Sequence, residues 1–126
     1  MSIKKILLIE DMADWQKTFL SFLSDISGIV VDTANGYDSA LKKATSRRYD
    51  IILSDTAYDD TDDDALTGLD LREKLVNGQY KHPQFVGMSS INRFQKNWED
   101  KGSYFVSKQP LEYDDFIRTV KRALSN

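Results

Sequence analysis

The sequence predicts an α/β fold, a single-domain doubly wound five-stranded parallel sheet with five helices. Three observations support this prediction. Five short apolar runs occur, and the runs at 29–33 and 51–53 are rich in β-branched residues, which is typical of buried strands. A segment whose apolar residues recur with helical period follows each run, so right-handed crossovers would place helices on both faces. Polar side chains follow the runs, at the sheet edge where such folds bind ligands.

The five expected strands differ in how strongly their residues favour burial. They cover residues 5–9, 29–33, 49–54, 85–88 and 104–107. The third contains Ile51, Ile52 and Leu53 without interruption, which is typical of a central strand. One sequence does not determine the strand order. We expect a flavodoxin-like order of 2-1-3-4-5, which would place the first and third strands side by side.

The five expected helices are recognised by apolar residues three or four positions apart. Their stripes are Trp15, Phe19, Phe22 and Leu23; Tyr37, Ala40, Leu41 and Ala44; Leu71, Leu75 and Val76; Ile91, Phe94 and Trp98; and Tyr113, Phe116, Ile117, Val120 and Leu124. Gly28, Gly78 and Gly102 stand where the first, third and fourth helices would end. Ser90 is a candidate cap for the fourth helix.

Length, charge and cysteine content limit the possible functions. The 126 residues, 40% of them hydrophobic, suffice for one domain covering 1–126. A net charge of -3 gives no field that would hold a polyanion, so we expect no nucleic-acid binding. The chain has no cysteine, which fits a reducing compartment, and the cytoplasm is the expected location. No stretch is long and apolar enough for membrane insertion.

Five polar residues follow the first, third, fourth and fifth expected strands. They are Glu10, Asp11, Asp55, Ser89 and Lys108. Three carboxylates at one sheet edge would repel one another unless one takes up a proton or a cation lies between them. Mg²⁺ prefers oxygen ligands and suits phosphoryl transfer. In that reaction Asp55 would be the nucleophile, while Lys108 and Ser89 would stabilise the charge on the phosphoryl oxygens.

These residues make the chain resemble the receiver domain of two-component response regulators. The resemblance implies that Asp55 accepts a phosphoryl group from a histidine kinase or a phosphotransfer protein. It also implies that Mg²⁺ is held by Glu10, Asp11, Asp55 and the Ala57 carbonyl. Ser89 would bind a phosphate oxygen, and Phe105 would change rotamer on activation. A downstream protein or output domain would then bind the surface formed by helix 4, strand 5 and helix 5. The resemblance also implies a monomer or weak dimer that is not a turnover enzyme.

Two alternatives start from the same residues. Gly68 lies thirteen positions after Asp55, and Gln109 separates Lys108 from Pro110, so a pseudo-receiver that binds partners without phosphorylation is one alternative. An aspartyl phosphatase is the other, although Ala57 cannot serve as the proton donor that this chemistry generally needs two residues after its nucleophile.

Other conspicuous residues have simpler interpretations. The acidic segment from Asp59 to Asp64 lacks the glycine and final glutamate of a calcium loop, so we interpret it as solvated. His82, the single histidine, precedes a proline and is expected at the surface. Trp15 and Trp98 lie on helical stripes and are expected in the core or at its edge.

Overall fold

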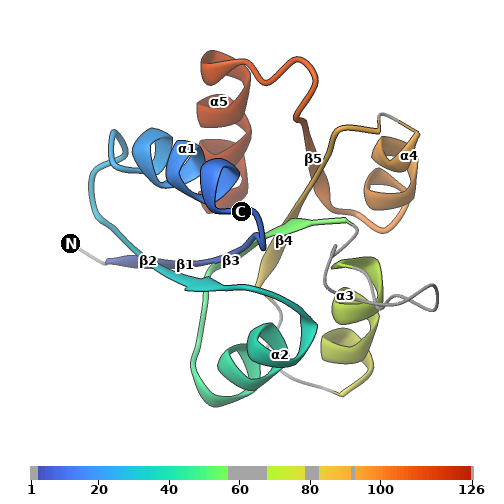
Figure 1. The fold of residues 1–126 in the computed structure, drawn as a ribbon. Coiled ribbons are helices and arrows are strands. Elements are labelled where there is room, and N and C mark those ends of the chain that lie inside the picture. The colour runs from blue at the N-terminus through green and yellow to red at the C-terminus, as the bar shows by residue number, and fades with distance from the viewer. Residues whose placement is uncertain (1–2, 57–67, 79–82, 92, 126) are drawn as a thin grey trace.

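A computed structural model describes residues 3–56, 68–78, 83–91 and 93–125, and it contains a five-stranded, all-parallel sheet (Figure 1). The strand order is β2-β1-β3-β4-β5, so the predicted fold class and order are confirmed. The strands are β1 (Lys4–Ile9), β2 (Ile29–Ala34), β3 (Ile51–Asp55), β4 (Gln84–Ser89) and β5 (Tyr104–Ser107). The helices are α1 (Ala13–Leu23), α2 (Tyr37–Ser46), α3 (Gly68–Asn77), α4 (Phe94–Glu99) and α5 (Tyr113–Leu124).

The strand register brings the carboxyl ends of four strands to one edge of the sheet. Ile9 pairs with Ser54 between β1 and β3, and Asp55 pairs with Met88 between β3 and β4. Ser89 pairs with Ser107 between β4 and β5. Because parallel strands end at the same edge, the residues after them meet across the sheet. This register positions the candidate site.

The α1–α5 side of the molecule consists of α1, α5 and the sheet residues that pack against them. Its core is almost entirely aliphatic and aromatic, and includes Ile6, Leu8, Leu53, Val86, Phe19 and Phe116. The Phe116 ring stacks on Phe19 with centroids 5.4 Å apart. Helix α5 has acidic residues in its first turn and basic residues in its last, which complements its dipole.

The α2–α4 side consists of α2, α3, α4 and the opposite face of the sheet. Its core includes Leu7, Ile9, Ile52, Leu71, Leu75, Phe85 and Trp98. Two glycines allow close packing here. A Cβ at Gly87 would lie 2.1 Å from the Trp98 ring, and one at Gly68 would lie 2.3 Å from the Asp55 carbonyl oxygen. Both positions therefore require a residue without a side chain.

Two sequence predictions at the start of the fourth helix are wrong. Helix α4 begins at Phe94, and Ile91 lies outside it with 47% of its surface exposed. Ile91 has the helical spacing from Phe94 and Trp98 by chance. The helix is so short that apolar spacing does not locate its first residue. Arg93 occupies the N-cap, so Ser90 is not the cap. Gly102, with φ of +78°, follows α4 as predicted.

Some predictions lie outside the described residues. Ala57, the acidic segment from Asp59 to Asp64, and His82 are among these. Within the described ranges, no helix combines the length and the apolar character needed to cross a bilayer.

Candidate phosphoacceptor site

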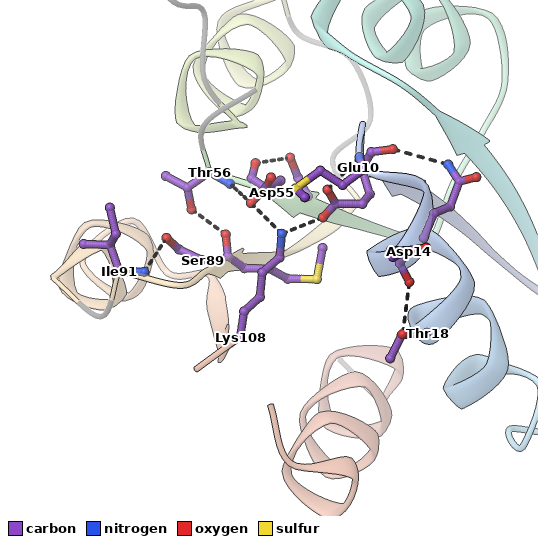
Figure 2. A network of polar contacts seen from close by, with 12 residues as sticks. Glu10, Asp14, Thr18, Asp55, Thr56, Ser89, Ile91 and Lys108 are labelled. Atoms are coloured by element: carbon purple, nitrogen blue, oxygen red, sulfur yellow. Dashed lines mark hydrogen bonds and ion pairs between the residues drawn. The ribbon is translucent and has the colours of Figure 1, made fainter. Parts of the chain in front are cut away.

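Charged side chains from three strand ends meet at the carboxyl edge of the sheet (Figure 2). Glu10 and Asp11 follow β1, Asp55 is the last residue of β3, and Lys108 follows β5. Glu10 is fully buried, and 13% of the Asp55 side chain is exposed. The site is therefore mostly shielded from water.

Lys108 connects two of the acids. Its Nζ lies 2.6 Å from Glu10 Oε2 and 3.1 Å from Asp55 Oδ1, and its side chain is 4% exposed. The same ammonium lies 5.2 Å from the centroid of the Trp15 ring and 5.8 Å from that of Phe19. Aromatic faces attract cations, most strongly where water is excluded. The lysine is thus held between carboxylates and aromatic rings.

The three acids form a cluster that could hold a metal ion. One carboxylate oxygen each of Glu10, Asp11 and Asp55 lies within 4.8 Å of the others. Burial raises the pKa of Asp55 to about 7, with the Glu10 charge adding to the increase and Lys108 opposing it. Burial also raises the pKa of Glu10, against the effect of Lys108. Three oxygen donors this close together fit a hard divalent cation such as Mg²⁺, which would stabilise the charged forms of Glu10 and Asp55.

Backbone groups fix the orientation of the carboxylates. The Thr56 N–H donates to Asp55 Oδ1 at 3.1 Å, and the Met12 N–H donates to Glu10 Oε1 at 3.2 Å. Hydrogen bonds to an ionised carboxylate stabilise its charge and oppose the effect of burial. Both acids are therefore oriented before any ligand binds.

Two other predicted residues, Ser89 and Phe105, lie on the neighbouring strands β4 and β5. Ser89 is buried, its hydroxyl oxygen accepts the Ile91 N–H at 2.9 Å, and its carbonyl accepts the Lys108 N–H at 2.8 Å. Phe105 in β5 is half-buried and packs against the core of the α2–α4 side. The inserted Gln109 does not displace Lys108, and the Gln109–Pro110 peptide is cis.

Sequence reasoning missed two contributors to this region, Thr56 and the indole of Trp98. Thr56 directly follows Asp55, and its hydroxyl accepts a hydrogen bond from Trp98 Nε1 at 2.8 Å. Gly87 is a feature of the sequence that could have indicated this packing, because glycine inside a strand often marks the close approach of another group. That group is the Trp98 ring.

The structure is similar to several solved receiver domains. The response regulator TrrA from Thermotoga maritima, solved with Mg²⁺-BeF, matches with a TM-score of 0.80 and 20% identity over 96% of this chain and 99% of its own. The chemotaxis response regulator CheY4 from Vibrio cholerae matches with a TM-score of 0.76 and 22% identity over 97% of this chain and 99% of its own. This chain has the receiver-domain fold of response regulators.

A longer protein contains the same receiver fold as one part. NtrX from Brucella abortus matches with a TM-score of 0.78 and 27% identity over 96% of this chain. The match covers 27% of NtrX. No protein-family model and no curated protein matches the sequence.

Proposed function

We propose that residues 1–126 form a phosphoacceptor receiver domain of a two-component signalling system. Asp55 would accept a phosphoryl group from the phosphohistidine of a histidine kinase or phosphotransfer protein. The observation that carries this proposal is the meeting of Asp55 with Lys108 Nζ at 3.1 Å beside the carboxylates of Glu10 and Asp11. Carboxylate nucleophiles form acyl phosphates, and the remaining task in phosphoryl transfer is positioning and charge stabilisation.

The transfer follows from the positions of these side chains. An Asp55 carboxylate oxygen bonds to phosphorus as the bond from phosphorus to the donor's imidazole nitrogen breaks, and the imidazole keeps the electron pair. The Lys108 ammonium stabilises the negative charge on the phosphoryl oxygens, and the Ser89 hydroxyl donates to one of them. No water is consumed in this step, so a buried site is an advantage.

A divalent cation, Mg²⁺, completes the proposed site. Glu10, Asp11 and Asp55 would hold it together with the Ala57 carbonyl. When bound, Mg²⁺ supplies positive charge to the phosphoryl oxygens. Its presence also favours the ionised form of Asp55, which is the nucleophilic form.

The signal would leave the domain through the surface formed by α4, β5 and α5. Phe105 lies on β5, within this surface, and it would change rotamer when Ser89 engages the phosphoryl group. A downstream protein or an output domain would read the change. We propose a cytoplasmic monomer or weak dimer that accepts and loses phosphate but does not act as a turnover enzyme.

Phosphorylation by acetyl phosphate tests the proposal. With Mg²⁺, the parent protein should gain the mass of one phosphoryl group, and chelation by EDTA should prevent the gain. Asp55→Asn should remain unlabelled because it lacks the nucleophile. Asp38→Asn, which changes an exposed acid in α2, should be labelled like the parent. A parent as unlabelled as Asp55→Asn would contradict the proposal and favour the pseudo-receiver.

A further inference from the structure

A buried hydrogen bond connects the residue after Asp55 to helix α4. The Thr56 hydroxyl donates to the Met88 carbonyl at 2.8 Å and accepts from Trp98 Nε1 at 2.8 Å. Thr56 is 1% exposed and Trp98 is fully buried. Figure 2 shows the Thr56 hydroxyl turned towards β4, while the Asp55 carboxylate faces Lys108. Thr56 thus lies between the candidate site and α4.

The packing around Trp98 leaves its ring little freedom. A Cβ on Gly87 of β4 would lie 2.1 Å from Trp98 Cε2, and a Cβ on Gly68 of α3 would lie 3.1 Å from Trp98 Cζ2. The indole therefore lies directly on β4 and next to the start of α3. A tightly packed ring with a buried donor can move only if its partners move or if the hydrogen bond breaks.

The Thr56 peptide is also in direct contact with the Asp55 carboxylate. Its N–H lies 3.1 Å from Asp55 Oδ1 and 2.9 Å from the Met88 carbonyl oxygen, so it is shared between two acceptors. A change of charge on the Asp55 carboxylate would alter this sharing. A shift of Thr56 would then reach Trp98 through the buried hydroxyl.

We propose that Thr56 and Trp98 are positioning residues that couple occupancy of the Asp55 site to the position of α4. This inference rests on the function proposed above. It differs from the Ser89 and Phe105 switch because it uses the Thr56 hydroxyl and the Trp98 indole, which take no part in that switch. Coupling between two sites is reciprocal, so α4 would also influence how ligands bind at Asp55.

Trp98 itself can report the coupling. The sequence has two tryptophans, so Trp15→Phe leaves Trp98 as the only one. In that background, Mg²⁺ with beryllofluoride should change Trp98 emission and the hydrogen exchange of α4 amides. Adding Thr56→Val removes the hydroxyl with little change of shape, and the emission change should become at least about fivefold smaller. Thr56→Ser keeps the hydroxyl and should retain the response.

Calorimetry separates failure of this inference from failure of the proposed function. If Mg²⁺ with beryllofluoride binds Trp15→Phe and its Thr56→Val derivative, and α4 responds only in the former, the coupling is supported. Equal responses of α4 in both proteins would overturn the coupling and leave the proposed function intact. No binding to the parent would overturn both. Circular dichroism of Thr56→Val checks that it is folded, and Trp98→Phe, which lacks the donor, gives a second variant that should lose the α4 exchange response.

Discussion

The two sides of the sheet are built differently. On the α1–α5 side, the two helices pack against each other through aromatic stacking, as between Phe19 of α1 and Phe116 of α5, over an apolar face of the sheet. The α2–α4 side places a hydrogen bond inside its core, from Trp98 to Thr56, beside the strand end that carries Asp55. Apolar packing is non-directional, whereas a buried hydrogen bond has a required geometry. A change at Asp55 should therefore affect the α2–α4 side more than the α1–α5 side.

Arg72 adds a second directional connection on the α2–α4 side. Its Nε donates to Ser103 Oγ at 3.1 Å, and its guanidinium lies 5.9 Å from the centroid of the Phe85 ring. Next to it, Lys101 pairs with Glu73 at 2.7 Å. These contacts join α3 to the segment between α4 and β5. The Lys101–Glu73 pair lies at the surface, so its contribution to stability is small, whereas Ser103 and Phe85 are buried beneath the Arg72 guanidinium.

The largest effect is expected from Phe116→Ala on the α1–α5 side. Phe116 is fully buried and contacts the rings of Phe19 and Phe22, so the substitution should reduce the free energy of unfolding by about 3–5 kcal/mol. Urea denaturation followed by circular dichroism measures the loss. In the folded fraction, Mg²⁺ and beryllofluoride should still change the Trp98 emission, because Phe116 lies on the opposite side of the sheet from α4.

Phe116→Leu is the matched control for this variant. It keeps most of the buried volume and should lose less stability than Phe116→Ala. If Phe116→Ala abolished the Trp98 response while remaining folded, the proposed difference between the two sides would be contradicted.

The second-largest effect on stability is expected from Asp55→Asn. Its pKa is raised by burial to about 7, so the folded protein binds this proton more tightly than the unfolded chain. Without metal, this group's contribution to stability is fully present below pH about 4 and is lost as pH rises towards 7. Asp55→Asn should remove that loss and raise the free energy of unfolding of the metal-free protein by about 1–3 kcal/mol at pH 8. The gain should be smaller than the full pKa shift of Asp55 implies, because the substitution takes an ion-pair partner from Lys108.

Thermal unfolding from pH 5 to pH 8 measures this difference. The advantage of Asp55→Asn should shrink as pH falls to 5, and Asp38→Asn should follow the parent throughout. Mg²⁺ should stabilise the parent more than Asp55→Asn, since it binds the folded site. An Asp55→Asn protein that is less stable than the parent at pH 8 without metal would show that Lys108 more than compensates for burial.

The sequence was sufficient to predict the fold and the position of the charged cluster. Strand ends of a parallel sheet share one edge, so the neighbouring β1 and β3 necessarily bring Asp11 and Asp55 together. Lys108 reaches the same place despite the inserted Gln109. These outcomes depend on patterns that are local in the sequence, namely apolar runs and the residues that end them.

The contact between Thr56 and Trp98 could not be predicted in the same way. The two residues are 42 positions apart, and their hydrogen bond depends on how α4 packs on β4. Helical spacing placed Trp98 in the core but gave no partner for its indole N–H. The same spacing wrongly included Ile91 in the helix. Periodicity indicates which face is buried, whereas a specific polar contact depends on the tilt and start of the element.

The smallest effect is expected where the α1–α5 side reaches the site, at Trp15. Its ring lies 5.2 Å from Lys108 Nζ, in a desolvated setting where such contacts contribute about 0.5–2 kcal/mol. Trp15→Leu should therefore slow phosphorylation of Asp55 by acetyl phosphate about 2- to 30-fold, because Lys108 is held less firmly beside the phosphoryl oxygens. The initial rate of labelling at saturating Mg²⁺ measures this effect.

Trp15→Phe distinguishes the aromatic contribution from simple packing. Phenylalanine keeps an aromatic face for the ammonium, so its rate should lie closer to the parent than that of Trp15→Leu, although leucine and phenylalanine are both apolar. Mg²⁺ affinity should change little in either variant, because the ring contacts the lysine and not the carboxylates that would hold the ion. Equal rates for the two variants would mean that Trp15 only fills space, and the α1–α5 side would then act purely as a scaffold for the site.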